Sequence, residues 1–174
     1  MRNLTKIIAV VSFVIIAATA NAQNAQGLKF GHVDLQALIQ VMPERATAET
    51  QFNEFQAELE DVLAEMQQNY QTKLQELEQL GETASEIKRN AKIEELQGIQ
   101  QRMQNYQVNA QQQLQQKQAE LLQPVFDKAE AAVEEVAKEE GLFYVFDVGS
   151  NVVLYKSNQS IDVLPLAKKK LGLE

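Results

Sequence analysis

The sequence contains no cysteine, and it has a single histidine and three prolines among its 174 residues. A chain without cysteine forms no disulfide, has no thiolate nucleophile and cannot carry a cysteine-linked lipid anchor. The sequence also lacks a G-x-S-x-G serine motif and a G-x-x-x-x-G-K-S/T phosphate loop. These absences argue against a serine or cysteine hydrolase and against an activity driven by ATP.

The single histidine, His32, lies two residues from Asp34 in a segment expected to be a strand. A His–Asp pair is used in acid–base catalysis, but no nucleophile motif accompanies this one. One histidine without cysteine also makes a zinc site improbable. We therefore expect a packed or hydrogen-bonded strand histidine, with no catalytic residue, no metal and no cofactor.

The first 22 residues have the pattern of a secretory signal peptide. Arg2 and Lys6 precede a mostly apolar run, Ile7–Ala20, and Ala20-Asn21-Ala22 supplies the small residues that signal peptidase accepts. The run is shorter than the roughly 20 apolar residues of a membrane span, although a retained N-terminal anchor is the alternative. We expect residues 1–22 to be cleaved and the rest of the chain to be exported.

The chain that remains is strongly acidic. It carries 14 Lys and Arg against 24 Asp and Glu, a formal net charge of −10. Nucleic-acid binding depends on neutralising phosphates with basic side chains, so nucleic acid is not an expected partner. The same charge argues against electrostatic attraction to anionic lipid. Without disulfides, the exported protein must gain its stability from packing or from self-association.

A stretch of 77 residues, 46–122, contains no proline, two glycines and eighteen glutamines, with thirteen acids to six bases. Two runs within it place apolar residues at every third or fourth position, which is the spacing of one helix face. Between the runs, Gly81 fits the end of one helix, and Thr83 with Glu86 fits a capping box that opens the next. We predict an antiparallel helical hairpin, an arm with legs roughly 50 Å long.

The apolar stripe of this arm supports two hypotheses. In the first, the stripe only joins the two legs to each other. In the second, a two-helix hairpin leaves part of its stripe open to an unfolded chain, a contact that pliable methionine side chains favour. The candidate contact residues are Phe52, Phe55, Met66, Tyr70, Leu74, Leu96, Ile99, Met103 and Tyr106.

Lys88, Arg89 and Lys92 form the one basic cluster of the arm, close to its tip. The simpler interpretation is a solvated face that balances nearby glutamates. The alternative is an ionic contact with a phosphate-bearing headgroup or with a carboxylate of a bound chain.

The segments on either side of the arm, residues 23–45 and 123–174, are predicted to form one small body. Leu28–Asp34 is expected to be a strand and Leu35–Val41 a helical turn, with Pro43 as the first residue of the long helix. Pro124 removes a backbone donor from the return helix and predicts a kink or break there.

The end of the chain is predicted to add two strands and a helix to the body. Gly141 should stop the return helix. Leu142–Val148 and Val152–Lys156 are then expected to be strands joined by a turn at Gly149-Ser150-Asn151. Ile161–Leu171 is expected to be a short terminal helix.

A body this small, with three strands, leaves sheet edges open and should be stabilised by self-association. The fold class is thus α+β, a small oligomerising sheet body with a protruding coiled-coil arm. The residues proposed for the oligomerisation body are Phe30, Val33, Phe143, Val145, Phe146, Val153 and Leu154.

The body segments carry short motifs in a definite order. Residues 29–36, Lys-Phe-Gly-His-Val-Asp-Leu-Gln, and Met42-Pro43-Glu44 precede the arm, and residues 143–147, 152–155, 161–163 and 171–173 follow it. In this order they resemble the opening, the C-terminal strand pair and the tail of the Skp/OmpH family of periplasmic chaperones.

The resemblance implies a periplasmic homotrimer in which the body strands form a shared core. Three arms would enclose a cavity that holds unfolded outer-membrane proteins without nucleotide or metal. The well-studied branch of the family has basic arms, whereas these are acidic, so contact with lipid or lipopolysaccharide is not carried over. The alternative is a structural or adaptor coiled-coil protein of the cell envelope that binds one folded partner. An enzyme is the third class, and no polar cluster favours it.

Overall fold

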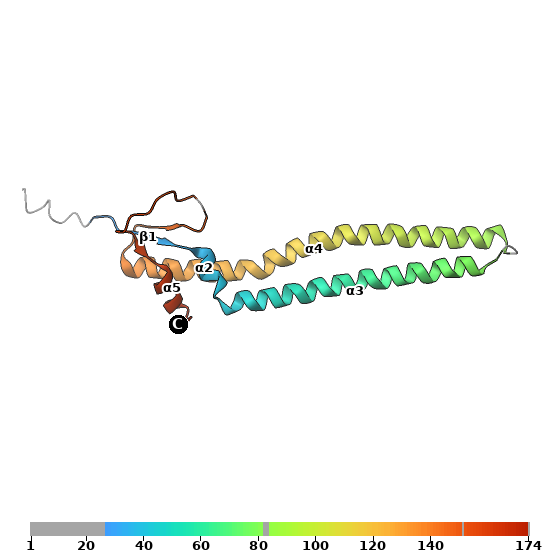
Figure 1. The fold of residues 1–174 in the computed structure, drawn as a ribbon, viewed down its shortest axis with the longest axis horizontal. Coiled ribbons are helices and arrows are strands. Elements are labelled where there is room, and N and C mark those ends of the chain that lie inside the picture. The colour runs from blue at the N-terminus through green and yellow to red at the C-terminus, as the bar shows by residue number, and fades with distance from the viewer. Residues whose placement is uncertain (1–26, 82–83, 151, 174) are drawn as a thin grey trace, which may run out of the picture.

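The computed structural model describes residues 27–81, 84–150 and 152–173. These residues form a small body from which a long two-helix arm projects (Figure 1). The chain is therefore α+β with a helical arm, as predicted. The predicted signal peptide, residues 1–22, lies outside the described residues.

The arm consists of α3, Pro43–Gln79, and the distal part of α4, Glu86–Glu140. The two helices run side by side in opposite directions, and their far ends meet at the arm tip (Figure 1). Pro43 lies in the first turn of α3, as expected, because that turn has no use for its missing N–H. After α3, Gly81 has a φ of 64°, a left-handed conformation that favours glycine and ends the helix.

The capping box predicted at the start of α4 is wrong. Ser85 is the N-cap residue, and its side chain makes no capping hydrogen bond. A capping box pairs the N-cap residue with the third helical residue, whereas Glu86 is the first. Thr83 itself lies outside the described residues. Arg89 instead ties this end to the other leg, because its Nη2 donates to the Gly81 carbonyl at 2.8 Å.

Helix α4 is not broken at Pro124. It continues to Glu140 and ends at Gly141, whose φ is 65°. Figure 1 shows that the helix changes direction where the arm joins the body, at the change from yellow to orange. The sequence predicted either a kink or a break at this proline, and the break is wrong. A bend accommodates the lost hydrogen bond and the crowding that a proline ring causes inside a helix.

The body contains a parallel sheet of three short strands in the order β2-β1-β3. The strands are β1, Phe30–Val33, β2, Tyr144–Asp147, and β3, Ile161–Asp162. In this register Phe30 lies beside Tyr144, and Gly31 lies between Val145 and Ile161.

The hairpin predicted for the end of the chain is wrong. Residues 152–156 form no strand in the described part of the chain, and the third strand comes later, at Ile161–Asp162. Both edges of β1 accept a partner, so β2 and β3 pair with β1 rather than with the segment between them. Asp147 closes a local turn, since its Oδ1 accepts from the Gly149 amide at 2.9 Å. Asn151 of the predicted turn lies outside the described residues.

Three helices cover one face of the sheet. They are α2, Leu35–Gln40, the body part of α4, and α5, Leu164–Lys170. Asp34 caps α2 by accepting from the Ala37 amide at 2.9 Å. The buried core beneath these helices consists of Val33, Leu38, Ile39, Met42, Val125, Ala129, Val136, Val163 and Ala167.

The terminal helix starts later than predicted. Ile161 and Asp162 join the sheet, and the Asp162 carboxylate accepts from the Leu164 amide at 3.0 Å. In Lys168-Lys169-Lys170, at the end of α5, Lys170 pairs with Glu135 and Glu139 of α4.

Candidate functional site

The seam between the two legs of the arm is closed most tightly towards the tip. Leu96 and Ile99 are 7% and 3% exposed, so these two candidate residues pack between the legs. The other seven candidates, Phe52, Phe55, Met66, Tyr70, Leu74, Met103 and Tyr106, are only half-buried. Two helices cannot enclose a seam from all sides, so this part of the stripe stays accessible to another chain.

Two contacts hold the middle of the seam in register. The Tyr106 hydroxyl on α4 donates to the Leu59 carbonyl on α3 at 3.2 Å. Nearer the body, the Lys117 ammonium lies 5.8 Å from the centroid of the Phe55 ring, within the range of a cation–π contact. The candidate residues Tyr106 and Phe55 therefore help to join the two legs and also contribute to the accessible surface of the seam.

An ion cluster joins the legs near the tip. This interleg cluster contains Lys73 and Glu76 from α3 and Lys92 and Glu95 from α4. Across the gap, Lys92 Nζ lies 2.5 Å from Glu76 Oε2 and Lys73 Nζ lies 3.4 Å from Glu95 Oε1. Each charge has opposite charges on both helices, which makes the cluster a network rather than an isolated pair.

The cluster shifts the pKa values of three of its members. Hydrogen bonds from Lys92 and then Lys73 lower the pKa of Glu76 below its ordinary value of 4.5. The Lys92 hydrogen bond also lowers the pKa of Glu95. In return, hydrogen bonds to Glu76 and Glu95 raise the pKa of Lys92 above 10.5. All three groups are charged at neutral pH.

The predicted basic tip is divided among different roles. Lys92 belongs to the interleg cluster, and Arg89 is bonded to the Gly81 carbonyl. Lys88 is exposed and forms no ion pair within the described ranges. Two of the three predicted tip cations thus have partners within the arm, so an ionic contact of this cluster with another molecule stays a prediction.

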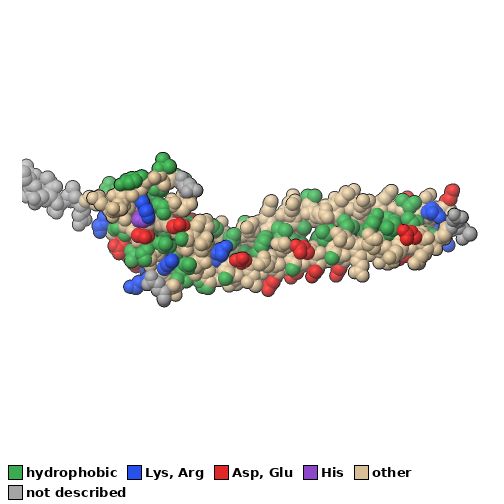
Figure 2. All heavy atoms as spheres, viewed as in Figure 1, with side chains coloured by type: hydrophobic (Ala, Val, Ile, Leu, Met, Phe, Trp, Pro, Cys, Tyr) green, Lys and Arg blue, Asp and Glu red, His purple; other side chains and the backbone are tan. Residues whose placement is uncertain are grey.

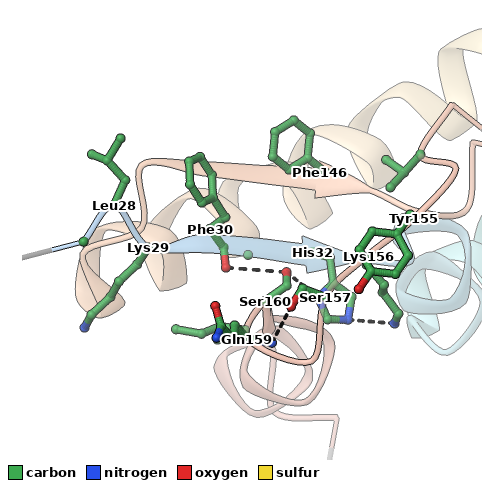
Figure 3. A pocket seen from close by; sticks show the side chains of 14 residues that line it. Leu28, Lys29, Phe30, His32, Phe146, Tyr155, Lys156, Ser157, Gln159 and Ser160 are labelled. Atoms are coloured by element: carbon green, nitrogen blue, oxygen red, sulfur yellow. Dashed lines mark hydrogen bonds between the residues drawn. The ribbon is translucent and has the colours of Figure 1, made fainter.

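The face of the sheet that the helices leave uncovered is aromatic. This aromatic face consists of Phe30, Tyr144 and Phe146, whose ring centroids are 6.1 to 6.5 Å apart. Phe143 lies at its edge, 5.0 Å from the Tyr144 ring. All four side chains are exposed, and Figure 3 shows the rings of Phe30 and Phe146 projecting from neighbouring strands. The four rings thus form one contiguous exposed apolar surface.

A pocket of about 460 Å³ lies between this face and the segment that precedes β3. His32 is buried beside it and hydrogen-bonded on both sides (Figure 3). Its Nε2 lies 2.8 Å from Lys156 Nζ, and its Nδ1 lies 2.9 Å from Ser160 Oγ. An ammonium group only donates, so Nε2 accepts and Nδ1 carries the proton to Ser160. The predicted hydrogen-bonded strand histidine is confirmed.

The residues proposed for oligomerisation lie in different surroundings. Val33 is buried in the core of a single chain, and Val145 packs against that core. Phe30, Phe143 and Phe146 are on or beside the aromatic face. Val153 is half-buried in the pocket lining, and Leu154 is 97% exposed.

Sequence reasoning missed Tyr144 and Tyr155. Side chains alternate between the two faces of a strand, so Tyr144 and Phe146 of β2 lie on the same face. This alternation was visible in the sequence. Tyr155 lines the pocket from the segment 152–156, which is predicted as a strand and forms none.

Within residues 27–81, 84–150 and 152–173, no group of three or more His, Cys, Asp or Glu lies close enough to hold a metal ion. No helix in those ranges is both long and apolar enough to cross a membrane.

This combination of a small sheet body and a long helical arm agrees with a family comparison. A family model described as outer membrane protein (OmpH-like) matches residues 29–171. The chain belongs to the OmpH-like family. Among the curated proteins compared, none matches it significantly. OmpH-like proteins are periplasmic chaperones of the Skp/OmpH type that bind unfolded outer-membrane proteins in general.

Proposed function

We propose that this OmpH-like protein is an ATP-independent holdase that keeps unfolded outer-membrane proteins apart in the periplasm, after cleavage of residues 1–22. The observation that carries the proposal is the half-buried seam of the arm. It presents many small apolar contacts along two long helices instead of one shaped pocket. Numerous weak contacts suit a client that has no fixed structure.

The assembly we propose is a homotrimer that joins through the aromatic face. Phe30, Tyr144 and Phe146 are exposed in a single chain, and β2 and β3 have no further strand beside them in the described residues. A parallel sheet is normally covered on both faces, so a second and third copy are the natural cover. Copies joined at the body carry their arms in the same direction.

The mechanism we propose is kinetic. A cavity between three arms isolates one client, so its exposed strand edges cannot pair with another chain. Three tethered arms raise one another's effective concentration at the client, so weak contacts add up to firm binding. Because the arms are acidic, we do not propose that they bind lipid or lipopolysaccharide.

Sedimentation of the chain that starts at residue 23 tests this proposal. We expect a trimer alone, and a single species of three chains and one client when a urea-unfolded outer-membrane barrel protein is diluted into it. The same barrel protein, folded in detergent, is the control and should not bind. Selective binding of one folded envelope protein, with no binding of unfolded chains, would instead establish the adaptor function.

A further inference from the structure

The two legs of the arm differ sharply in charge. Residues 96–119 of α4, which we call the amide stretch, contain eleven glutamines and two asparagines but no acidic residue. Their only charges are Arg102 and Lys117. The facing stretch of α3, residues 50–73, carries five acids, Glu54, Glu58, Glu60, Asp61 and Glu65, against one base. Figure 2 shows the acidic groups along the α3 edge, whereas the α4 edge is uncharged over most of its length.

A groove on the arm opens beside the amide stretch. Its volume is about 460 Å³, and α4 lines it with Tyr106, Gln107, Val108, Ala110, Gln111 and Leu114. The opposite wall is Gln56, Leu59, Glu60 and Leu63 of α3. Val108 is 59% exposed on this groove although it lies away from the seam residues of its helix. On α4, the groove is therefore lined by apolar and by amide side chains together, with no acidic residue among them.

We propose that the client lies along the amide stretch, with its apolar side chains in the groove and its backbone bonded to the glutamines. This inference rests on the proposed function and specifies which side of the arm performs it. Glutamine both donates and accepts hydrogen bonds, so it can pair with the free N–H and C=O groups of an unfolded chain. The five carboxylates of the facing α3 stretch only accept hydrogen bonds, and they repel any acidic client segment.

The occupant is an extended segment in which apolar and polar residues alternate. Strands of outer-membrane barrels have this pattern, so one side of such a segment fits the groove and the other faces the amides. The amide stretch has 24 residues, so it is about 36 Å long at 1.5 Å per residue. That length matches about 11 residues of extended chain at roughly 3.3 Å each. Barrel strands have about 9–11 residues, so one strand segment covers the whole stretch.

Isosteric charge substitutions test the placement. The triple variant Gln104→Glu, Gln107→Glu and Gln111→Glu adds three acids to the amide stretch. The matched control, Gln68→Glu, Gln71→Glu and Gln75→Glu, adds three acids to α3 at the same spacing. All six glutamines are exposed. We expect the first triple to weaken binding of an unfolded barrel protein by about tenfold, a loss of about 1.4 kcal/mol, and the control to leave it within about twofold.

Cross-linking provides a second readout, because the chain has no cysteine of its own. Val108→Cys and Val62→Cys each give one attachment point for a photoreactive group, on α4 and α3 respectively. Val62 is 41% exposed, so both sites are accessible. We expect the unfolded client to cross-link mainly from position 108. Equal cross-linking from both positions, or equal loss of affinity in both triples, would overturn the placement while leaving the holdase function intact. A wild-type chain that binds no client would instead defeat the proposed function.

Discussion

Lys92 Nζ lies 2.5 Å from Glu76 Oε2 and so links the return leg of the arm to the outgoing leg near the tip. Lys92 also pairs with Glu95, and Lys73 completes the cluster from α3. Along the middle of the arm, the apolar stripe and the hydrogen bond from Tyr106 to the Leu59 carbonyl hold the two helices together. An alternating set of charges across the gap has one preferred alignment.

The first prediction is that acid loosens the arm tip. The pKa values of Glu76 and Glu95 are lowered in the folded protein. The stability that these two carboxylates contribute is therefore fully present above pH 4.5 and is lost as the pH falls through their lowered pKa values. Lys92 has a raised pKa, so its share is present below 10.5 and is lost only at strongly alkaline pH. Hydrogen exchange of α3 and α4 near the cluster, corrected for intrinsic rates, should rise at pH 3 relative to pH 7.

Lys92→Met is the matched variant for this measurement, because it keeps an unbranched side chain, one atom shorter, and removes the charge. It should show faster exchange near the tip at pH 7 and a smaller additional increase at pH 3. If acid loosens wild type and variant equally, the cluster does not hold the legs.

The second prediction concerns the hydrogen bond from Tyr106 to the Leu59 carbonyl. Tyr106→Phe removes the hydroxyl and keeps the ring, so we expect a loss of about 1 kcal/mol of unfolding free energy. Tyr70→Phe is the control, because the Tyr70 hydroxyl has no hydrogen-bond partner in the described ranges. Chemical denaturation of both variants should separate them, and equal stabilities would contradict a role for this bond.

The third prediction compares two glycines. A Cβ at Gly31 would lie 2.7 Å from Leu142 Cδ1 and 2.9 Å from Val163 Cγ2, so Gly31→Ala should overpack the body and cost about 1–3 kcal/mol. A Cβ at Gly98, inside α4, would meet only Arg102 Nη1 at 3.6 Å. Gly98→Ala should therefore stabilise the arm by up to about 1 kcal/mol, since alanine favours helices. Thermal unfolding measures both, and a stabilising Gly31→Ala would show that the sheet and helices are not packed as described.

The fourth prediction concerns self-association. Phe146→Asp places a carboxylate on the aromatic face, so the assembly should dissociate because a buried unpaired charge is costly. Ile87→Asp, at an apolar position near the arm tip that is 82% exposed, is the control and should keep the native mass. Light scattering measures the mass, and circular dichroism checks that both variants stay folded. An unchanged mass for folded Phe146→Asp would exclude the aromatic face as the interface.

The sequence predicted the arm better than the body, for physical reasons. Apolar residues at every third or fourth position over dozens of residues leave few alternatives to a long helix. The backbone preferences of Pro43, Gly81 and Gly141 then mark where the helices begin and end. Val152–Lys156 was misread because alternation identifies a strand-like segment but not its pairing partner. Pairing here is decided by β1, which is far away in the sequence and pairs with β2 at one edge and with β3 at the other.

The candidate site was predictable only in part. Helical spacing located the stripe, but it could not reveal that Leu96 and Ile99 are buried while Met103 is half-open, since that depends on the register of α3 against α4. Lys92 stood out as a basic tip residue, yet its partner Glu76 is 16 positions away on the other leg. The charge difference between the legs was present in the sequence, but its meaning depends on Val108 lining the groove.

The most direct test of the holdase function is the aggregation of an unfolded outer-membrane barrel protein diluted from urea, with and without the chain from residue 23 and without ATP. We predict that light scattering is suppressed and that suppression saturates near three chains per client. Undiminished aggregation in the presence of the folded protein would contradict the function proposed for it.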